Sequence, residues 1–528
     1  MRSDVLISGA GPTGLVLALW LTKLGVKVHI IDKTSAPGAT SRALAVQART
    51  LELYRQLDLA DAVVTGGHKV PAVNLWVKGE RKAQVTFETI GSDLTPFPFL
   101  HIFPQDQHER LLIERLKQLG VSVQRETELL RFTDDGDRVL ATLRGPDGRE
   151  QAWEARYLAG CDGARSRVRE TLGTGFPGGT YKQVFYVADV DASGPSLDGQ
   201  LHIDLDEADF LAVFPLAGEG RARLIGTVRD ERAEHAETLR FEDVSGRAIE
   251  HLKVTVKQVH WFSTYRVHHR VTEHFRQGRA FLLGDAAHIH SPAGGQGMNT
   301  GIGDAINLAW KLAAAIAGQA PDAVLDSYEA ERISFARRLV ATTDRVFTFA
   351  TAEGRLADIV RTRLAPAVIP AALHVDAIRE FMLRTVSQIT LNYRGCPLSE
   401  GAASDVHGGD RLPWVTLGSA DNFSSLTAMT WQVHVYGSAN ARLREYCDRH
   451  ALPLHVFDWQ PQCQTAGLAR DALYLIRPDT YVALANAQGD PQVVDNYFTS
   501  RGIKLGPAHA IRSARSEHVA PTGDLDES

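Results

Sequence analysis

The stretch DVLISGAGPTGLVLALWLTKLGVKVHIIDK, residues 4–33, decides how the chain begins to fold. A short apolar run, residues 4–8, leads into a glycine-rich turn, and apolar residues then follow at helical spacing: Leu17, Trp20, Leu21 and Leu24. Gly25 ends this helix, and VKVHIIDK has the composition of a second strand. A strand, a turn, a helix and a strand within about thirty residues form a βαβ unit. Such a unit predicts a parallel sheet covered by helices.

The turn carries Gly9-x-Gly11-x-x-Gly14, and Asp32 closes the second strand. After a strand and before a helix, this pattern is the dinucleotide-binding fingerprint. Gly9 makes the tight turn, Gly11 lets a pyrophosphate approach the helix N-terminus, and Gly14 allows close packing of helix on strand. Asp32 would accept hydrogen bonds from a ribose. The alternative is a purely structural turn with an Asp at the strand end.

Composition narrows the class of protein. The chain has 528 residues, which is too many for one core and predicts two to four domains. The net charge of -6 and the lack of a dense Lys/Arg block argue against nucleic acid or an acidic membrane as partner. The four cysteines form no CxxC pair, which argues against a zinc site and a disulfide framework and fits a cytoplasmic protein. We find no signal peptide and no apolar run of transmembrane length.

The pattern of apolar and polar residues changes along the chain. Alternating runs such as AVNLWVKG, QVFYVADV and ARLIGTV indicate antiparallel strands that interrupt the nucleotide domain twice. We therefore predict an α/β fold with the following division: a nucleotide-binding domain over 1–72, 100–179 and 266–395, an inserted antiparallel-sheet domain over 73–99 and 180–265, a third unit over 400–510 and a flexible tail over 511–528.

A second glycine-rich stretch, FLLGDAAHIHSPAGGQGMNTGIGDA, runs from residue 281 to residue 305. So many glycines let a backbone approach a bound group closely. Asp285 comes at the end of a strand, although it could also be a turn or helix-start residue. We expect residues 294–299 to precede a helix whose buried face carries apolar residues: Ile302, Ala305, Ile306, Ala309, Leu312 and Ala313. The N–H groups of that helix would then point at the bound group.

This stretch resembles the second FAD-binding motif of the class A flavoprotein monooxygenases, which have the para-hydroxybenzoate hydroxylase fold. YLAGCDGARSRVR, residues 157–169, resembles the "DG" motif of that family, and LDSYEAER, residues 325–332, resembles its following helix. These motifs stand in the family's order from Ser3 to about Arg338. Through GDRLP and YLIRPDTYVALA, the third unit resembles the thioredoxin-like C-terminal domain of the phenol and polyketide hydroxylase branch, which lacks a working CxxC.

The resemblance implies a Rossmann-like FAD-binding domain with an inserted substrate-binding sheet, and it implies a set of cofactor contacts. Asp285 would accept from the ribityl hydroxyls, and the glycine-loop N–H groups would stabilise negative charge on the flavin. Arg42 and Gln105 would lie near the flavin, unless they are a surface Arg and a helix-capping Gln. The implied cofactor-binding residues are Gly9, Gly11, Pro12, Thr13, Gly14, Asp32, Lys33, Arg42, Gln105, Asp162, Gly163, Arg165, Gly284, Asp285, Pro292, Gly295, Gly297, Met298 and Asn299. The family more often has Glu-Arg where this chain has Asp32-Lys33.

The resemblance also implies an activity. NADPH or NADH would reduce the FAD, dioxygen would add at the flavin C4a to give a hydroperoxide, and a phenolic ring would take up one oxygen atom. Dimers are a tendency of the family. A Baeyer–Villiger or epoxidising reaction on a polycyclic polyketide shares the same motifs. A flavin-binding module without turnover is a third possibility, which the intact glycines and Asp285 disfavour.

The substrate side is less well defined by the sequence. No residue stands out as the group that activates a phenol; Tyr265, His290 and Pro292 are catalytic candidates because they flank the flavin loop. Phe210, Val213 and Phe214 could line the pocket, although core packing is an alternative for each. The pairs His288/His290 and His268/His269 lack a carboxylate at ligand spacing, so we predict no metal.

Overall fold

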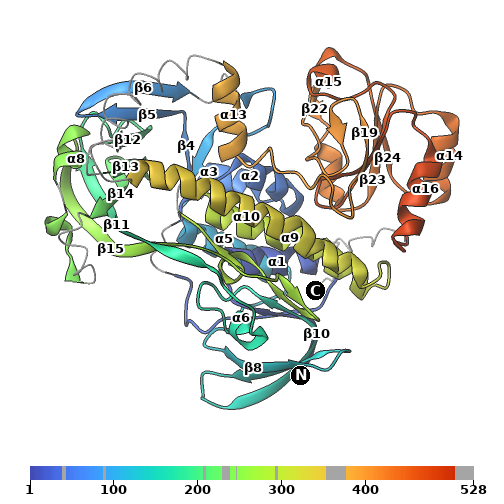
Figure 1. Ribbon diagram of the computed structural model, residues 1–528, viewed down its shortest axis with the longest axis horizontal. Coiled ribbons are helices and arrows are strands. Elements are labelled where there is room, and N and C mark those ends of the chain that lie inside the picture. The colour runs from blue at the N-terminus through green and yellow to red at the C-terminus, as the bar shows by residue number, and fades with distance from the viewer. Residues whose placement is uncertain are drawn as a thin grey trace, which may run out of the picture.

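The computed structural model describes residues 1–38, 43–86, 91–205, 210–228, 238–244, 246–291, 295–351 and 376–505. Figure 1 shows an antiparallel sheet on one side, the C-terminal domain on the other and two long helices, α9 and α10, running between them. In the described part of the chain, no helix is both long and apolar enough to cross a membrane.

A seven-stranded sheet forms the base of the nucleotide domain. Its parallel strands lie in the order β17–β10–β1–β2, and antiparallel strands extend it. Val5, Leu6 and Ile7 of β1 are all fully buried, as expected for a parallel strand covered on both faces. The strands are β1 (Arg2–Ser8), β2 (Val28–Ile31), β8 (Glu128–Asp134), β9 (Val139–Arg144), β10 (Glu150–Gly160), β16 (Arg276–Gln277) and β17 (Ala280–Leu282). The sequence interpretation did not include the β8–β9 pair.

Helices cover this sheet. α1 is buried from Pro12 through Leu21 except at Thr13, so it is apolar on nearly all sides rather than amphipathic. It packs in the same core as the buried face of α9. The helices of this domain are α1 (Pro12–Lys23), α5 (Gln105–Gln118), α6 (Arg167–Leu172), α9 (Gln296–Ile316) and α10 (Ala323–Thr351).

A smaller layer joins this domain to the antiparallel sheet. Its strands pair in the order β3–β7–β4 and are β3 (Ala45–Val46), β4 (His68–Val70) and β7 (Leu100–Ile102); the neighbouring helices are α2 (Ala48–Tyr54) and α3 (Ala60–Gly66). Leu44, Val70 and Ile102 pack against residues of the antiparallel sheet in one cluster. One face of the antiparallel sheet is therefore turned toward the nucleotide domain.

The eight-stranded sheet has the order β18–β15–β11–β14–β13–β12–β5–β6 and is antiparallel except between β12 and β5. Its strands are β5 (Ala72–Val77), β6 (Glu80–Thr86), β11 (Gly178–Ser193), β12 (Leu201–Leu205), β13 (Phe210–Pro215), β14 (Arg221–Val228), β15 (Thr255–Val271) and β18 (His288–Ile289). Helix α8 (Arg247–His251) covers the face opposite the nucleotide domain. Because β18 belongs to the second glycine-rich stretch, that stretch is hydrogen-bonded directly to this sheet.

The C-terminal domain has the thioredoxin-like order β-α-β-α-β-β-α. Strand β23 lies between parallel β24 and antiparallel β25, and β26 follows β25. Its elements are β19 (Glu400–Ala403), β20 (Val406–His407), β23 (Gln432–Tyr436), α14 (Ala441–Arg449), β24 (Leu454–Phe457), α15 (Pro461–Thr465), β25 (Leu473–Ile476), β26 (Val482–Asn486) and α16 (Pro491–Ser500). Helix α13 (Asp376–Val386) precedes this domain, and the short strands β21 (Thr416–Leu417) and β22 (Ala420–Asp421) lie within it. The tail over 511–528 lies outside the described residues.

Candidate active site

Four motifs that are far apart in the sequence lie side by side at one edge of the parallel sheet. Gly9 follows β1, Asp32 follows β2, Asp162 follows β10 and Gly284 follows β17 soon after its last residue. Ser8 pairs with both Ile31 and Gly160, and Gly160 pairs with Leu282, so the four strands end together. The carboxyl edge of a parallel sheet is where this class of fold binds its ligands.

The first glycine loop is shaped by backbone contacts. Gly9 has a φ of +105°, and a Cβ on it would lie 2.2 Å from the Cys161 carbonyl oxygen. A Cβ on Gly14 would lie 2.0 Å from the Gly9 carbonyl oxygen. A Cβ on Gly11 would meet no atom within 4 Å. Gly9 and Gly14 are therefore required by the fold, whereas Gly11 faces open space at the start of α1.

Asp32 closes this loop from the side. Its Oδ2 accepts from the backbone N–H of Ala10 at 2.7 Å, and its Oδ1 accepts from the N–H and the hydroxyl of Thr34 at 2.8 and 2.7 Å. The carboxylate thus holds the glycine loop in addition to any bond with a ribose. The neighbouring Gln105 begins α5, where its Nε2 donates to Glu109 at 2.8 Å and its N–H donates to the Ala43 carbonyl.

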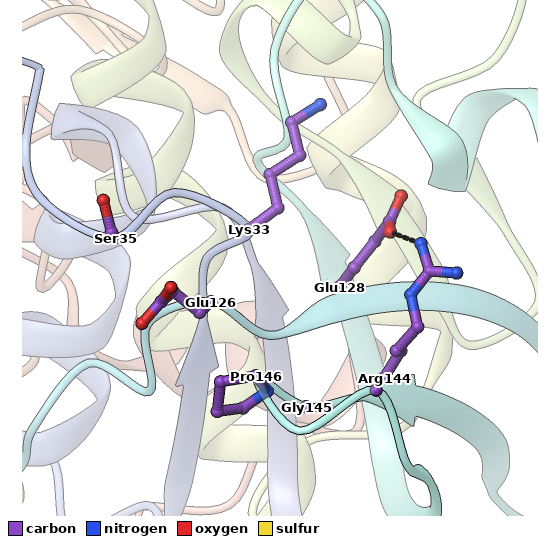
Figure 2. A pocket seen from close by; sticks show the side chains of 8 residues that line it. Lys33, Ser35, Glu126, Glu128, Arg144, Gly145 and Pro146 are labelled. Carbon is purple, nitrogen blue, oxygen red and sulfur yellow. Dashed lines mark hydrogen bonds and ion pairs between the residues drawn. The ribbon is translucent and has the colours of Figure 1, made fainter.

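Lys33 lies at the rim of an open hollow of about 470 Å³ beside Asp32. Figure 2 shows its side chain directed away from Glu126, and an ion pair between Glu128 and Arg144 on the far side. The hollow is lined by Lys33, Ser35, Glu126, Glu128, Arg144, Gly145, Pro146 and Gly148. This hollow is a surface feature next to the strand end that carries Asp32.

The loop after β10 contains Asp162, Gly163 and Arg165. Asp162 Oδ2 accepts from the Val168 N–H at 3.1 Å, while its buried Oδ1 has no hydrogen-bond partner among the residues that the structure describes. Burial raises the pKa of Asp162. Gly163 has a φ of +79° and an open side, and Arg165 is exposed.

Arg169, which the sequence interpretation did not single out, ties two of these loops together. Its guanidinium donates to the Ala164 carbonyl at 2.7 Å and to the Ala286 carbonyl at 2.9 Å. It also stacks on the ring of Phe176 at 3.9 Å. The loops after β10 and β17 are therefore fixed relative to each other by one buried side chain.

The second glycine loop is held from behind by Asp304 of α9. Its Oδ2 accepts from the Gly284 N–H at 3.0 Å and from His288 Nε2 at 2.7 Å, and its Oδ1 accepts from Arg332 Nε at 2.6 Å. Burial alone would raise the pKa of Asp304, but Arg332 and His288 hold it below its ordinary value. Asp285, in contrast, is exposed in a short 3₁₀ turn, Gly284–Ala286. The signal for Asp304 was an acid within a buried apolar helix face, and the sequence interpretation missed it.

The start of α9 differs from the prediction. The helix begins at Gln296, so Gly297, Met298 and Asn299 lie in its first turn instead of preceding it. The reason is Gly295, whose φ of +63° lets the chain turn directly into the helix. Among the residues that the structure describes, no side chain caps this end or the start of α1, so first-turn backbone N–H groups at both helices are available to a ligand.

The Asn299 side chain contacts protein groups and not open space. Its Oδ1 accepts from the Gln47 N–H at 2.9 Å and from the Thr50 hydroxyl at 2.7 Å. Its Nδ2 donates to the carbonyls of Ala45 and Gly295. This amide has its full set of hydrogen bonds, so Asn299 holds the loop in place, and any contact of Asn299 with a cofactor must come from its backbone.

His290 lies between β18 and the first turn of α9. Its Nδ1 donates to the Ser291 carbonyl at 2.9 Å, which leaves Nε2 as an acceptor. Nε2 is buried without a partner in the described ranges, and it lies 3.8 Å from where a Cβ on Gly297 would be. Burial, with His288 nearby, lowers the pKa of His290 to about 4, so the ring is neutral near pH 7. Arg42 and Pro292 lie outside the described residues.

The antiparallel sheet presents aromatic side chains on its face toward the nucleotide domain. Phe185 pairs across the strands with Tyr265, and Phe210 packs against Phe185 in the same cluster. Phe210 and Phe214 also join the cluster of Leu44 and Ala45, and Ala45 lies next to Gly295 of the second glycine loop. Val213, expected beside Phe214, packs in the core on the opposite face of the sheet because alternate residues of a strand point to opposite sides.

Three of the four histidines in the two pairs contact protein groups directly. His288 binds Asp304, His268 hydrogen-bonds Thr180 at 2.7 Å, and His269 packs on Tyr181. No group of three or more His, Cys, Asp or Glu residues within the described ranges could hold a metal ion.

The residues at this edge fit an FAD molecule. Gly11 and Gly163 are open where a phosphate or a flavin would approach, and no described side chain caps the start of α1 or α9. Asp162 Oδ1 and His290 Nε2 are buried polar atoms with no hydrogen-bond partner in the described part of the chain. When bound, FAD supplies the redox and oxygen-transfer chemistry, and the chain supplies its orientation and electrostatics.

Comparisons with known proteins agree with this geometry. The model of the FAD binding domain family matches residues 2–343. The chain is 39% identical over 423 residues to 6-methylpretetramide 4-monooxygenase of Streptomyces rimosus, covering 77% of this chain and 73% of that one. It is 31% identical over 419 residues to pentachlorophenol 4-monooxygenase of Sphingobium chlorophenolicum, covering 78% and 75%.

A solved structure extends the likeness beyond the nucleotide domain. The anhydrotetracycline hydroxylase OxyS from Streptomyces rimosus superposes with a TM-score of 0.76 at 28% identity, over 96% of this chain and all of that one. The match therefore includes the thioredoxin-like C-terminal domain. With the fingerprint loops, the fold and these relatives in agreement, the chain belongs to the family of FAD-dependent aromatic monooxygenases of the para-hydroxybenzoate hydroxylase fold.

Proposed function

We propose that this enzyme hydroxylates a phenolic ring of a polycyclic aromatic substrate of the polyketide type, with NADPH or NADH as reductant and dioxygen as the oxygen source. The observation that carries the proposal is the aromatic face of the antiparallel sheet formed by Phe185, Phe210 and Tyr265, which adjoins the second glycine loop through Ala45. The similarity to a 6-methylpretetramide 4-monooxygenase and to an anhydrotetracycline hydroxylase supports the polycyclic class.

The position of this aromatic face suggests which parts of the chain bind the FAD and which bind the substrate. Residues 1–72, 100–179 and 266–395 bind the FAD, and residues 73–99 and 180–265 provide the substrate side. Flat aromatic side chains bind a flat ring system by offset or edge contacts. We assign Tyr265, Phe210 and Phe214 to the substrate wall, and Val213 to the core behind it. Burying the ring against this wall also keeps water from the reacting atoms.

The cofactor contacts proposed from the sequence are retained with two changes. The backbone from Gly9 to Gly14 receives the pyrophosphate, Asp32 the ribose, and Asp285 the ribityl chain. The first turn of α9, at Gly297 and Met298, stabilises negative charge on the flavin with its backbone N–H groups. Asn299 contributes only through its backbone, and Asp304 is added as the side chain that holds Gly284.

His290 is the candidate for accepting a hydrogen bond in this site. The Ser291 carbonyl fixes its tautomer, and its low pKa keeps it neutral, so Nε2 presents a lone pair at the working pH. Exchange of this residue for Gln would keep a polar group but remove the basic nitrogen.

The test is NAD(P)H oxidation by the FAD-loaded enzyme, with and without a panel of simple and polycyclic phenols, followed by product masses. Stimulation by a polycyclic phenol with one oxygen added on a ring is the expected result. A product with oxygen inserted beside a ketone, or an epoxide, would replace the proposal by a Baeyer–Villiger or epoxidising reaction. Bound FAD without turnover on any compound would favour a binding module.

A matched pair of variants tests the substrate wall. Phe210→Ala should raise KM for the aromatic substrate, because it removes a ring from the face toward the glycine loop. Phe262→Ala removes a half-buried ring from the opposite face of the same sheet and should leave KM unchanged. Equal changes in KM for the two variants would contradict the assignment of this face.

A further inference from the structure

A buried chain of hydrogen bonds runs from the second glycine loop to the C-terminal domain. Arg332 of α10 donates through Nε to Asp304, which in turn accepts from the Gly284 N–H. Arg332 Nη2 donates to the Thr300 carbonyl at 3.0 Å, and Arg332 Nη1 donates to the Tyr393 hydroxyl at 3.0 Å. Arg332 is 2% exposed and Asp304 is 0% exposed. Every link is therefore made away from water.

Tyr393 lies where the two domains meet, and apart from its bond with Arg332 and the nearby Phe335 its printed contacts are with the C-terminal domain. Its N–H donates to the Gly409 carbonyl at 2.7 Å, and its ring lies 4.4 Å from that of Tyr481, between centroids. The guanidinium of Arg477 lies over the same ring at 5.4 Å. The position of the Tyr393 hydroxyl thus depends on the C-terminal domain being docked.

Buried ion pairs attach the C-terminal domain to α9 and α10 close to Arg332. Arg477, at the end of β25, donates to both carboxylate oxygens of Glu331 at 2.6 and 3.0 Å, and Lys311 of α9 donates to Glu331 at 2.8 Å. Burial alone would raise the pKa of Glu331, but Arg477 and Lys311 lower it to about 2. Because Glu331 and Arg332 are neighbours on α10, the ion pair and the hydrogen-bond chain act on the same turn of helix.

A second contact reaches the start of α9 from the same side. Gln388, which lies between α13 and the C-terminal domain, donates to the Thr300 hydroxyl at 3.1 Å. Gln296, the first residue of α9, donates to the Val386 carbonyl at 2.8 Å. The segment that leads into the C-terminal domain therefore packs on the back of the helix whose N-terminus faces the flavin site.

We propose that Tyr393 is a positioning residue for FAD, and that the thioredoxin-like domain serves this enzyme as a clamp on the second glycine loop. Loss of the Tyr393 hydroxyl leaves a buried donor of Arg332 without an acceptor, which Arg332 corrects only by moving. Its bond to Asp304 then changes, and Asp304 no longer holds Gly284 and His288 in one place. This inference rests on FAD binding at that loop.

The test compares Tyr393→Phe with Tyr497→Phe. Tyr497 is equally buried, and its hydroxyl donates to the Leu398 carbonyl at 3.0 Å in the C-terminal domain. Both variants lose one buried hydrogen bond, so the fall in melting temperature should be similar. FAD is titrated into apoprotein, and the midpoint potential of the bound flavin is measured. We expect Tyr393→Phe to weaken FAD binding roughly five- to thirtyfold and to shift the potential, and Tyr497→Phe to do neither.

Arg332→Lys completes the experiment. If Tyr393 acts through Arg332, then adding Tyr393→Phe to Arg332→Lys should cause no further loss of FAD affinity, because the shared contact is already gone. Equal FAD affinity and potential in Tyr393→Phe and the wild type would overturn the inference, as would additive losses in the double variant. Wild-type protein that binds no FAD would overturn both this inference and the proposed function. FAD binding without turnover of any aromatic compound would count against the proposed function alone.

Discussion

The two glycine loops of the proposed FAD site are built in different ways. The first, from Gly9 to Gly14, is shaped by its own backbone and by residues within one βαβ unit. Its main contact with a residue far away in the sequence is Cys161. The second, of which residues 284–291 and 295–299 are described, is held by buried side chains from α2, α9 and α10 and through Tyr393 by the C-terminal domain. The first loop is therefore most sensitive to changes within its own βαβ unit. A loop held by distant side chains can be damaged from far away.

The largest effect is expected from Arg332→Leu, which lies on α10 and outside both loops. The change leaves Asp304 as a buried carboxylate without its cation, at a cost of about 3 to 5 kcal/mol. Chemical denaturation of the apoprotein measures this loss. Arg337→Leu, an exposed site on the same helix, should change the unfolding free energy by less than about 0.5 kcal/mol. Similar stabilities for the two variants would show that the second loop is not held by Arg332.

The first loop should respond to a methyl group according to its position. A Cβ on Gly14 meets the Gly9 carbonyl, so Gly14→Ala should cost about 3 kcal/mol in apoprotein stability. Gly11→Ala meets no atom and should leave the apoprotein intact, yet weaken FAD binding roughly tenfold or more, because the methyl group blocks the approach of the pyrophosphate. Calorimetry of the apoproteins and FAD titration separate the two effects. Unchanged FAD affinity in Gly11→Ala would place the pyrophosphate elsewhere.

Acid should weaken the second loop and its surroundings. His290 has a folded pKa of about 4 and an ordinary value of 6.5. The unfolded chain therefore binds a proton that the folded protein does not, and stability falls as the pH drops from 6.5 to 4. Between pH 7 and pH 5, His290 contributes roughly 2 kcal/mol to this fall. His101, held near 4 by burial, acts in the same direction. Thermal unfolding at pH 7, 6 and 5 should show the decline, and His290→Gln should make it shallower.

The smallest effect on stability is expected from Asp285→Ala. The residue is exposed, so the apoprotein should change by less than about 0.5 kcal/mol in unfolding free energy. FAD affinity should nevertheless fall roughly tenfold, since a charged acceptor for the ribityl hydroxyls is lost. Asp448→Ala, an exposed site on α14, is the matched control. If Asp285→Ala holds FAD as tightly as the wild type, the assignment of the second motif is wrong.

Several features of the structure differ from what the sequence suggested, and each has a physical reason. The β8–β9 pair, which extends the parallel sheet, was not predicted. Its strands are short and carry charged outer residues, so their apolar periodicity is weak. The helix after the second loop begins earlier than expected because Gly295 turns directly into it. Val213 lies in the core behind the proposed substrate wall. Strand alternation shows that Val213 and Phe214 face opposite sides, but the sequence does not show which side faces the nucleotide domain.

The sequence by itself determined the βαβ unit and the first glycine loop with Asp32, because these depend on local spacing and turn chemistry, which a single sequence displays. The FAD-binding class and the thioredoxin-like C-terminal domain were predicted from the resemblance of contiguous motifs to a known family. Only the tertiary structure decided that Asp304, Arg332 and Tyr393 form one buried chain to the second loop. Their partners are many residues apart, and which polar side chains meet inside a core depends on how whole domains pack.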